Sequence, residues 1–245
     1  SQELWKPVFY SQETQWVDSI LANLSEDERI GQLFMVAAFS NKESSHKEKI
    51  SALIKKYKIG GLMFLQGSPT KQAKLTNHFQ SISKTPLMIA LDAEWGPAMR
   101  VDSVMQFPWQ MTLGAIEDEN LIYMMGEQIA NQCRLLGVNI NFAPVADINS
   151  NPRNPIIGNR SFGESPQKVS RFSTAYMQGM QDNGVLACAK HFPGHGDTDT
   201  DSHETLPVIR HNRYRLNTTE ITPFRHLITK GLGSVMVAHL RIPAI

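Results

Sequence analysis

Residues 184–203 read GVLACAKHFPGHGDTDTDSH, an apolar run that leads into a polar loop, and the rest of the chain is organised around them. The first six residues of this stretch are apolar, which predicts a buried strand. The polar segment that follows holds three His and three Asp, and Pro193, Gly194 and Gly196 interrupt regular structure within it. A strand that ends in such a loop is where α/β enzymes place their chemistry. The alternative is a solvated surface loop that happens to hold charge.

Apolar runs of strand length alternate with helical patterns along the rest of the chain. Strands are expected at 33–39, 59–65, 86–92, 138–147, 184–190 and 234–239. Helices are expected at 14–24, 47–57, 70–83, 119–136, 166–183 and 219–230, with a capping box at Ser25 and Glu28. In the helix at 119–136, Leu121, Met124, Met125 and Ile129 are expected to face inward. The strands are continuous apolar runs, which predicts a parallel sheet buried on both faces by helices.

Two architectures compete for this pattern: an open doubly wound sheet and a (β/α)8 barrel. No GxGxxG motif follows the first strand, as a dinucleotide-binding sheet would require. Polar residues end several strands, and a barrel would bring them to one mouth: Asp92, Asp147, Lys190, His191 and His239. The sequence therefore favours an α/β protein with a TIM-type (β/α)8 barrel.

The expected barrel is incomplete at its C-terminus. Only about six βα units are found, whereas a full barrel takes about 250 residues and eight units. Residues 1–24 are interpreted as an N-terminal segment, and residues 25–245 as the catalytic barrel domain without its last βα units. The chain begins with Ser1, which favours an exported or periplasmic protein over a cytoplasmic one.

The composition is that of a globular protein with a sizeable core. The 245 residues are 41% hydrophobic and 19% charged, and the net charge is +1. This overall balance gives no indication of a nucleic acid or an anionic membrane surface as a partner. No apolar run approaches the ~20 residues that a membrane-spanning helix needs. Cys133 and Cys188 stand in apolar surroundings, which predicts buried free thiols rather than a disulfide.

Asp201 and His203 form a candidate acid/base pair in the polar loop. A carboxylate that accepts a hydrogen bond from one ring nitrogen fixes the tautomer of the imidazole. The other ring nitrogen can then exchange a proton near neutral pH. A local Asx-type turn is the alternative interpretation of these two residues.

A metal site is a second interpretation of the same loop. His191, His195, Asp197 and His203 are suitable ligand types. However, the sequence contains neither HExxH nor a paired CxxC, and Lys190 would repel a cation beside His191. We expect no metal.

Three further charged residues suit a polyol substrate. Asp92 and Arg100 lie eight residues apart around a Gly-Pro pair, and together they offer an acceptor and a guanidinium donor for hydroxyl groups. Arg160 lies in a polar loop with the same capacity. The alternatives are an ordinary surface ion pair for the first two residues and a loop brace for Arg160.

Taken together, these motifs resemble the β-N-acetylhexosaminidases of glycoside hydrolase family three. The matching stretches are 30–33, 91–94 with Arg100, 139–147, 159–163, 190–198, 201–203, 206–207 and 223–239. The resemblance implies a TIM-like barrel and retaining hydrolysis that removes terminal β-N-acetylglucosamine from peptidoglycan fragments or related glycans. It implies a carbohydrate partner, no cofactor and no metal, and it leaves room for an additional C-terminal domain.

The resemblance also implies roles for individual residues. His203 is the acid/base, and Asp201 orients it. The sugar hydroxyls are held by residues that match the family pattern, with Arg100 close by: Asp92, Arg160, Lys190 and His191. An imidazole acid/base departs from the usual pair of carboxylates. A neutral imidazole can deprotonate water without placing a second anion beside the glycosyl-enzyme ester.

Two departures from the family pattern qualify these expectations. Trp95 follows Glu94 where the family commonly has glycine, so this ring either stacks on a sugar or fills a gap. The nucleophile of the family is an Asp on a later strand, which is expected beyond residue 245. Two other functions are therefore considered: a carbohydrate-binding barrel without catalysis, and a metal-dependent hydrolase that uses the His/Asp loop.

Overall fold

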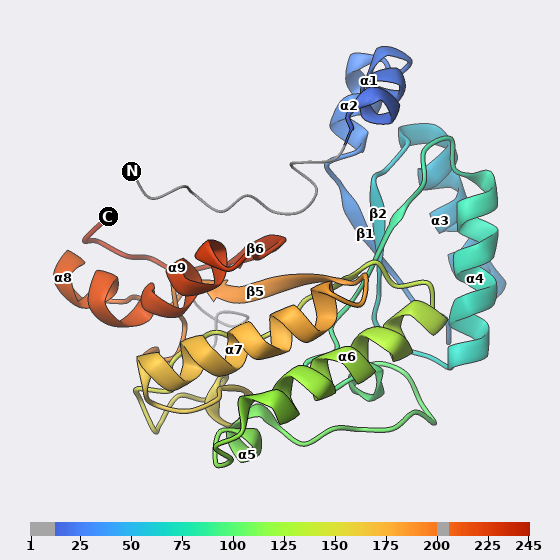
Figure 1. The fold of residues 1–245 in the computed structure, drawn as a ribbon. Coiled ribbons are helices and arrows are strands. Elements are labelled where there is room, and N and C mark those ends of the chain that lie inside the picture. Colours follow the sequence, from blue (N-terminus) through green and yellow to red (C-terminus); the bar gives the residue numbers. More distant parts are fainter. Residues whose placement is uncertain (1–12, 200–205) are drawn as a thin grey trace.

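A parallel sheet of six strands is the framework of the protein in a computed structural model, which describes residues 13–199 and 206–245. The strands are β1 (Met35–Ala38), β2 (Gly61–Phe64), β3 (Met88–Leu91), β4 (Ile140–Asn141), β5 (Leu186–Phe192) and β6 (Ser234–Val237). They pair in sequence order, every pair is parallel, and the sheet curls into an arc (Figure 1). A doubly wound sheet would reverse its strand order. The arc is therefore part of a TIM-type barrel, as the sequence predicted.

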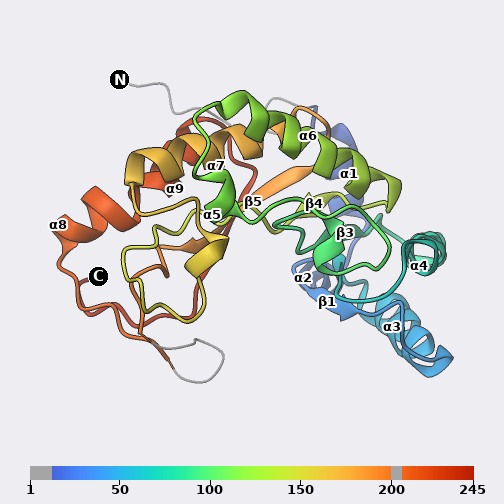
Figure 2. The same cartoon turned by 90° about the horizontal axis from the view of Figure 1, so that it is seen from below.

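Helices lie along the outside of this arc (Figure 2). The long helices are α3 (Ser44–Tyr57), α4 (Pro69–Ile82), α6 (Glu119–Leu135) and α7 (Pro166–Gln181). The short ones are α1 (Gln15–Ala22), α2 (Glu26–Gly31), α5 (Gln110–Leu113), α8 (Arg213–Arg215) and α9 (Thr222–Thr229), with single turns η2 (Pro97–Met99), η3 (Gly158–Arg160) and η4 (Leu216–Glu220). The predicted capping box is present, because Ser25 and Glu28 exchange both of its hydrogen bonds. In the described part of the chain, no helix has the length and apolarity to cross a membrane.

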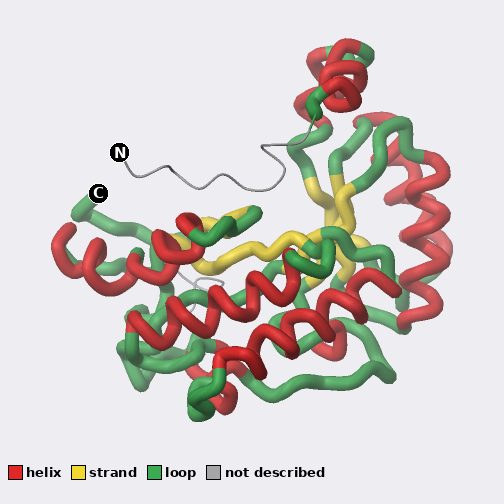
Figure 3. Tube along the Cα trace, viewed as in Figure 1, coloured by secondary structure: helices red, strands yellow, loops and turns green. Residues whose placement is uncertain are grey.

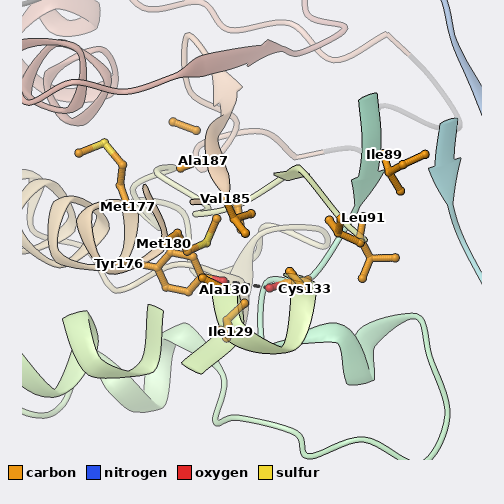
Figure 4. Packing of buried hydrophobic residues seen from close by; sticks show 14 of the residues in the cluster. Ile89, Leu91, Ile129, Ala130, Cys133, Tyr176, Met177, Met180, Val185 and Ala187 are labelled. Atoms are coloured by element: carbon orange, nitrogen blue, oxygen red, sulfur yellow. Dashed lines mark hydrogen bonds between the residues drawn. The ribbon is translucent and has the colours of Figure 1, made fainter. Parts of the chain in front are cut away.

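The main core lies where α6 and α7 pack together beneath the strands (Figure 4). Tyr176 and Met180 of α7 are fully buried, and so is Cys133 of α6. Both cysteines of the chain are buried and free, as predicted. The two helices approach closely at Gly126 and Gly179. A Cβ atom there would lie 2.5 and 2.1 Å, respectively, from a carbonyl oxygen of the opposite helix, so neither position accepts a side chain without a shift of the backbone.

Two expectations about burial are wrong. Leu33, Phe34 and Met35 keep 85%, 59% and 37% of their surface exposed, although the first strand was expected to be buried on both faces. Among the described residues, β1 has a strand neighbour on one side only. On α6, Leu121 and Met124 are exposed, because the buried residues of this helix are each one position further along the chain, at Ile122 and Met125.

Loops occupy much of the space beside the strands, as the green segments of Figure 3 show.

Candidate active site

A cavity of about 680 Å³ opens at the carboxyl ends of the strands. All five residues that the sequence predicted to bind substrate line it: Asp92, Arg100, Arg160, Lys190 and His191. They come from the segment after β3, from η3 and from β5, which are far apart in the chain. The curvature of the sheet therefore brings the separate motifs to one place.

Lys190 is the centre of a buried cluster of ions. Its side chain is only 3% exposed, and its Nζ atom lies 2.9 Å from Oδ1 of Asp92 and 2.7 Å from Oε1 of Glu94. On the other side of Asp92, Nη2 of Arg100 donates to Oδ2 at 2.6 Å. Arg160 donates two parallel hydrogen bonds to Glu94, at 2.9 and 2.7 Å. Each carboxylate thus lies between two cations, which fixes its orientation.

Both carboxylates are held in their charged form. Burial alone would raise the pKa of Glu94, but the charges and hydrogen bonds of Lys190 and Arg160 outweigh burial and lower this pKa to about 2. Burial likewise opposes the ionisation of Asp92, and Lys190 and Arg100 together bring its pKa below the ordinary value. The cavity therefore presents fixed anionic acceptors beside fixed cationic donors.

The depressed pKa of Glu94 predicts a loss of stability in acid. Unfolding returns this pKa from about 2 to about 4.5. The contribution of Glu94 is therefore complete above about pH 4.5, is lost as the pH falls toward 2, and amounts to about 3 kcal/mol. Urea unfolding across this range should show the loss in the wild type and a smaller loss in Glu94→Gln. An identical pH profile for the two proteins would contradict this account.

Asp147 is completely buried and holds His191 in place. Its carboxylate accepts hydrogen bonds from the backbone N of His191 at 3.1 Å, from the Nδ1 atom of the same ring at 2.7 Å and from the backbone N of His195 at 2.7 Å. Burial alone would raise the pKa of Asp147, but His191 and these hydrogen bonds lower it. An ionised carboxylate only accepts, so Nδ1 of His191 carries a proton. The Nε2 atom of that ring lies 3.4 Å from Nη2 of Arg160.

The loop after β5 packs tightly against the chain that follows β4. A Cβ atom on Gly196 would lie 1.7 Å from the carbonyl oxygen of Ile148, so only glycine fits there. His195 also lines the cavity, and its Nδ1 atom lies 2.7 Å from Oγ1 of Thr198. Burial lowers the pKa of His195, which favours its neutral form.

The predicted acid/base pair, Asp201 and His203, lies outside the described residues. Just before that gap, Asp197 contacts His211 through its carboxylate. Within residues 13–199 and 206–245, no group of three His, Cys, Asp or Glu side chains is placed to hold a metal ion. Of the candidate ligands in this part of the chain, His191 and Asp197 instead have protein partners.

Sequence reasoning missed the residues that brace the site. The side-chain amide of Asn141 accepts from the backbone N of Ala93 at 2.9 Å and donates to its carbonyl oxygen at 3.1 Å. The hydroxyl of Tyr176 donates to the same carbonyl at 2.9 Å. Together they fix the segment that carries Asp92 and Glu94. Glu94 could have been predicted from its position two residues after Asp92, because residues i and i+2 of an extended segment lie on the same side.

An aromatic pair forms another part of the cavity lining. The ring centroids of Trp95 and Trp109 lie 4.0 Å apart, with an angle of 40° between the ring planes. Trp95 thus packs on a second indole and lines the cavity as well. The two rings supply an apolar surface next to the ion cluster.

Known enzymes that act on glycosides resemble this chain over most of its length. The model of the Glycosyl hydrolase family 3 N terminal domain matches residues 25–245. Beta-hexosaminidase A of Pseudoalteromonas piscicida is 38% identical over 211 residues, which are 80% of this chain and 35% of that protein. A family 3 β-N-acetylglucosaminidase structure from Paenibacillus sp. has 40% identity and a TM-score of 0.84, and the match covers 91% of this chain and 43% of that one. The structure of the β-glucoside phosphorylase BglX bound to 2FGlc has 29% identity and a TM-score of 0.92, over 99% and 44% of the respective chains.

The curled parallel sheet and the polar cavity at its carboxyl edge define a barrel domain of the TIM type. The chain belongs to glycoside hydrolase family 3 and matches the N-terminal domain of that family, as the sequence motifs implied. It spans between 35% and 44% of the length of the three relatives described above.

Proposed function

We propose that the protein removes terminal β-N-acetylglucosamine from glycans, peptidoglycan fragments among them, by retaining hydrolysis. The observation that carries this proposal is the convergence of the five predicted residues on one cavity. Two buried carboxylates, Asp92 and Glu94, are paired there with Arg100, Arg160 and Lys190, and the buried carboxylate of Asp147 holds His191 from behind. A balanced set of fixed donors and acceptors suits a neutral sugar, whose hydroxyl groups need both. Two of the relatives are a β-hexosaminidase and a β-N-acetylglucosaminidase by name.

In this proposal the ion cluster binds and orients the sugar. The sugar hydroxyl groups are held by Asp92, Arg100, Arg160, Lys190 and His191. Such positioning contributes several kcal/mol to the stabilisation of the transition state. His203, oriented by Asp201, protonates the leaving oxygen and then takes a proton from the attacking water. The aromatic surface of Trp95 and Trp109 stacks on the next sugar ring of the substrate.

The nucleophile is a separate part of the proposal. Asp92 and Glu94 are the described carboxylates that line the cavity, and each is paired with two cations. Such pairing draws electron density from the carboxylate oxygens, so they are poor nucleophiles toward the anomeric carbon of the sugar. We therefore assign nucleophilic attack to an Asp outside the described residues, as the family resemblance implies.

The test is release of nitrophenol from p-nitrophenyl β-N-acetylglucosaminide, with the β-glucoside as control. Selective turnover would support the proposal. Binding of N-acetylglucosamine without turnover would favour a non-catalytic carbohydrate-binding barrel, and loss of activity with a chelator would favour a metal-dependent hydrolase. Parallel assays with and without phosphate would separate hydrolysis from transfer to phosphate.

His203→Ala should lower turnover of this substrate about a hundredfold. This loss is at the low end of the rate enhancements that general acid–base catalysis provides, because nitrophenolate is a good leaving group that needs little protonation. The remaining defect lies in the attack of water on the glycosyl-enzyme. Azide attacks without a general base, so it should restore turnover. His226→Ala, which changes a histidine on α9 away from the cavity, serves as the matched control. Normal turnover by the His203 variant, without azide, would refute the assigned role.

A further inference from the structure

Lysine is concentrated in one segment of the chain. Residues 41–84, which include α3 and α4, contain nine Lys and two Glu and neither Arg nor Asp. This segment has a formal charge of +7, whereas the whole chain has +1, so the remaining residues carry −6. The overall net charge therefore hides a strongly basic region, and such asymmetry is typical of a surface for an anionic partner.

Four of these lysines surround one hollow of about 260 Å³ between the starts of α3 and α4: Lys42, Lys47, Lys71 and Lys74. A second hollow of about 550 Å³ continues from it between the two helices and adds Lys55. We call these five residues the lysine groove. Within the described part of the chain, none of their ammonium groups forms an ion pair. Glu43 and Glu48 also line the hollows, so positive charge remains in clear excess.

The positions of two of these lysines do not serve the stability of the helices. Lys47 lies in the first turn of α3, whose N-cap residue is Glu43, and Lys71 lies in the first turn of α4; neither first turn itself contains an acidic residue. A cation at a helix N-terminus opposes the helix dipole, whereas an anion is favoured there. Besides burial, Lys47 and Lys55 lower the pKa of His78 on α4. The groove is thus a place of positive potential.

The first hollow of the groove lies at the same edge of the sheet as the cavity, and the second runs along α3 toward Lys55 in its last turn. The first hollow is lined by Phe39 and Ser40, which directly follow β1, and the cavity is lined by Met63 of β2 and by Asp92 after β3. Neighbouring strands are about 4.8 Å apart, so β1 and β3 are separated by about 10 Å. A polymer whose end occupies the cavity must extend at least this far to reach the first hollow.

We propose that the lysine groove binds the carboxylate or phosphate groups of an anionic polysaccharide. This proposal rests on the proposed function, since the cavity at the same edge then takes the terminal sugar of that polymer. Single-stranded nucleic acid is a poorer fit, because base stacking requires accessible aromatic rings. The aromatic ring in the first hollow, Phe39, is half-buried and lies beneath Lys42, with Nζ 3.8 Å from the ring centroid.

The test is direct binding of hyaluronan, which carries one carboxylate per disaccharide, with carboxyl-reduced hyaluronan as the neutral control. Lys47→Gln, Lys71→Gln and Lys74→Gln are combined in one variant. Its matched control combines Arg134→Gln, Lys230→Gln and Arg241→Gln, which removes three exposed charges elsewhere. The groove variant should bind hyaluronan about tenfold more weakly, with a shallower dependence on salt, whereas the control variant should bind as the wild type does.

Equal losses in the two variants would show an effect of net charge and would overturn the proposal. Equal binding of hyaluronan and its carboxyl-reduced form would overturn it as well. A groove-dependent preference for single-stranded DNA or for anionic vesicles would assign the groove to another class of partner. Turnover of p-nitrophenyl β-N-acetylglucosaminide should be the same in all three proteins. Its absence in all of them would refute the proposed function, whereas the binding data would still decide the role of the groove.

Discussion

Lys190→Met should lower the free energy of unfolding by about 3 kcal/mol and kcat/KM by about a hundredfold or more. Methionine keeps the unbranched stem of the side chain, one atom shorter than that of lysine, but removes the charge that lies between Asp92 and Glu94. Two buried carboxylates would then face each other, each with one half-exposed arginine left as a partner. Loss of one partner from a buried ion pair is costly because the remaining charge stays desolvated.

The pH dependence of this loss has a definite sign. Without Lys190, the pKa values of Asp92 and Glu94 should rise, because burial and mutual repulsion then oppose ionisation. Protonation relieves that repulsion, so the difference in stability between variant and wild type should shrink as the pH falls through these raised pKa values. Urea unfolding at several pH values measures it.

Two further variants isolate the cause. Lys190→Met combined with Glu94→Gln should recover part of the stability, since one of the two unpaired charges is removed. Lys230→Met, which changes an exposed lysine after α9, controls for the substitution itself. A loss in Lys190→Met that is the same at every pH, and is not relieved by Glu94→Gln, would indicate a packing defect rather than an electrostatic one.

Much of the fold follows from local sequence patterns. The apolar run before Lys190 and the other apolar runs predict the strands, and polar residues at their ends favoured the barrel over the open sheet. What periodicity could not decide was the burial of individual faces. Leu33 and Phe34 have the apolarity of core residues, yet both lie just before the edge strand β1 and remain exposed. Burial of a strand depends on its neighbours, and a local pattern carries no information about them.

The candidate site was predictable in part. Asp92 and Lys190 were recognised from motifs, but a pattern of letters did not show that both share one cluster with Glu94. The braces were harder to find. Asn141 and Tyr176 act on the backbone of Ala93 from β4 and α7, and nothing in their local sequence distinguishes them from ordinary strand and helix residues. Such long-range hydrogen bonds become visible only when the sheet is assembled.

Asp147→Asn should lower the free energy of unfolding by about 3 kcal/mol and should also displace the His191 ring. The carboxylate of Asp147 accepts hydrogen bonds from three N–H groups in a fully buried place. Asparagine has one acceptor oxygen, and its NH₂ group would face donors that have no other partner. Each buried donor left unsatisfied costs about 1–3 kcal/mol, and hydrogen bonds to charged groups are at the strong end of the range.

The same substitution should impair the proposed sugar binding through His191. Asp147 does not line the cavity, so it acts by holding the imidazole with Nε2 near Arg160. Asp147→Asn should therefore lower kcat/KM at least as much as His191→Ala does, whereas His191→Ala should retain most of the stability, because the backbone donors to Asp147 remain. The double variant should lose little more activity than either single variant, since the free-energy effects of substitutions at coupled residues do not add. Independent, multiplying losses would show that Asp147 affects the cavity by a route other than His191.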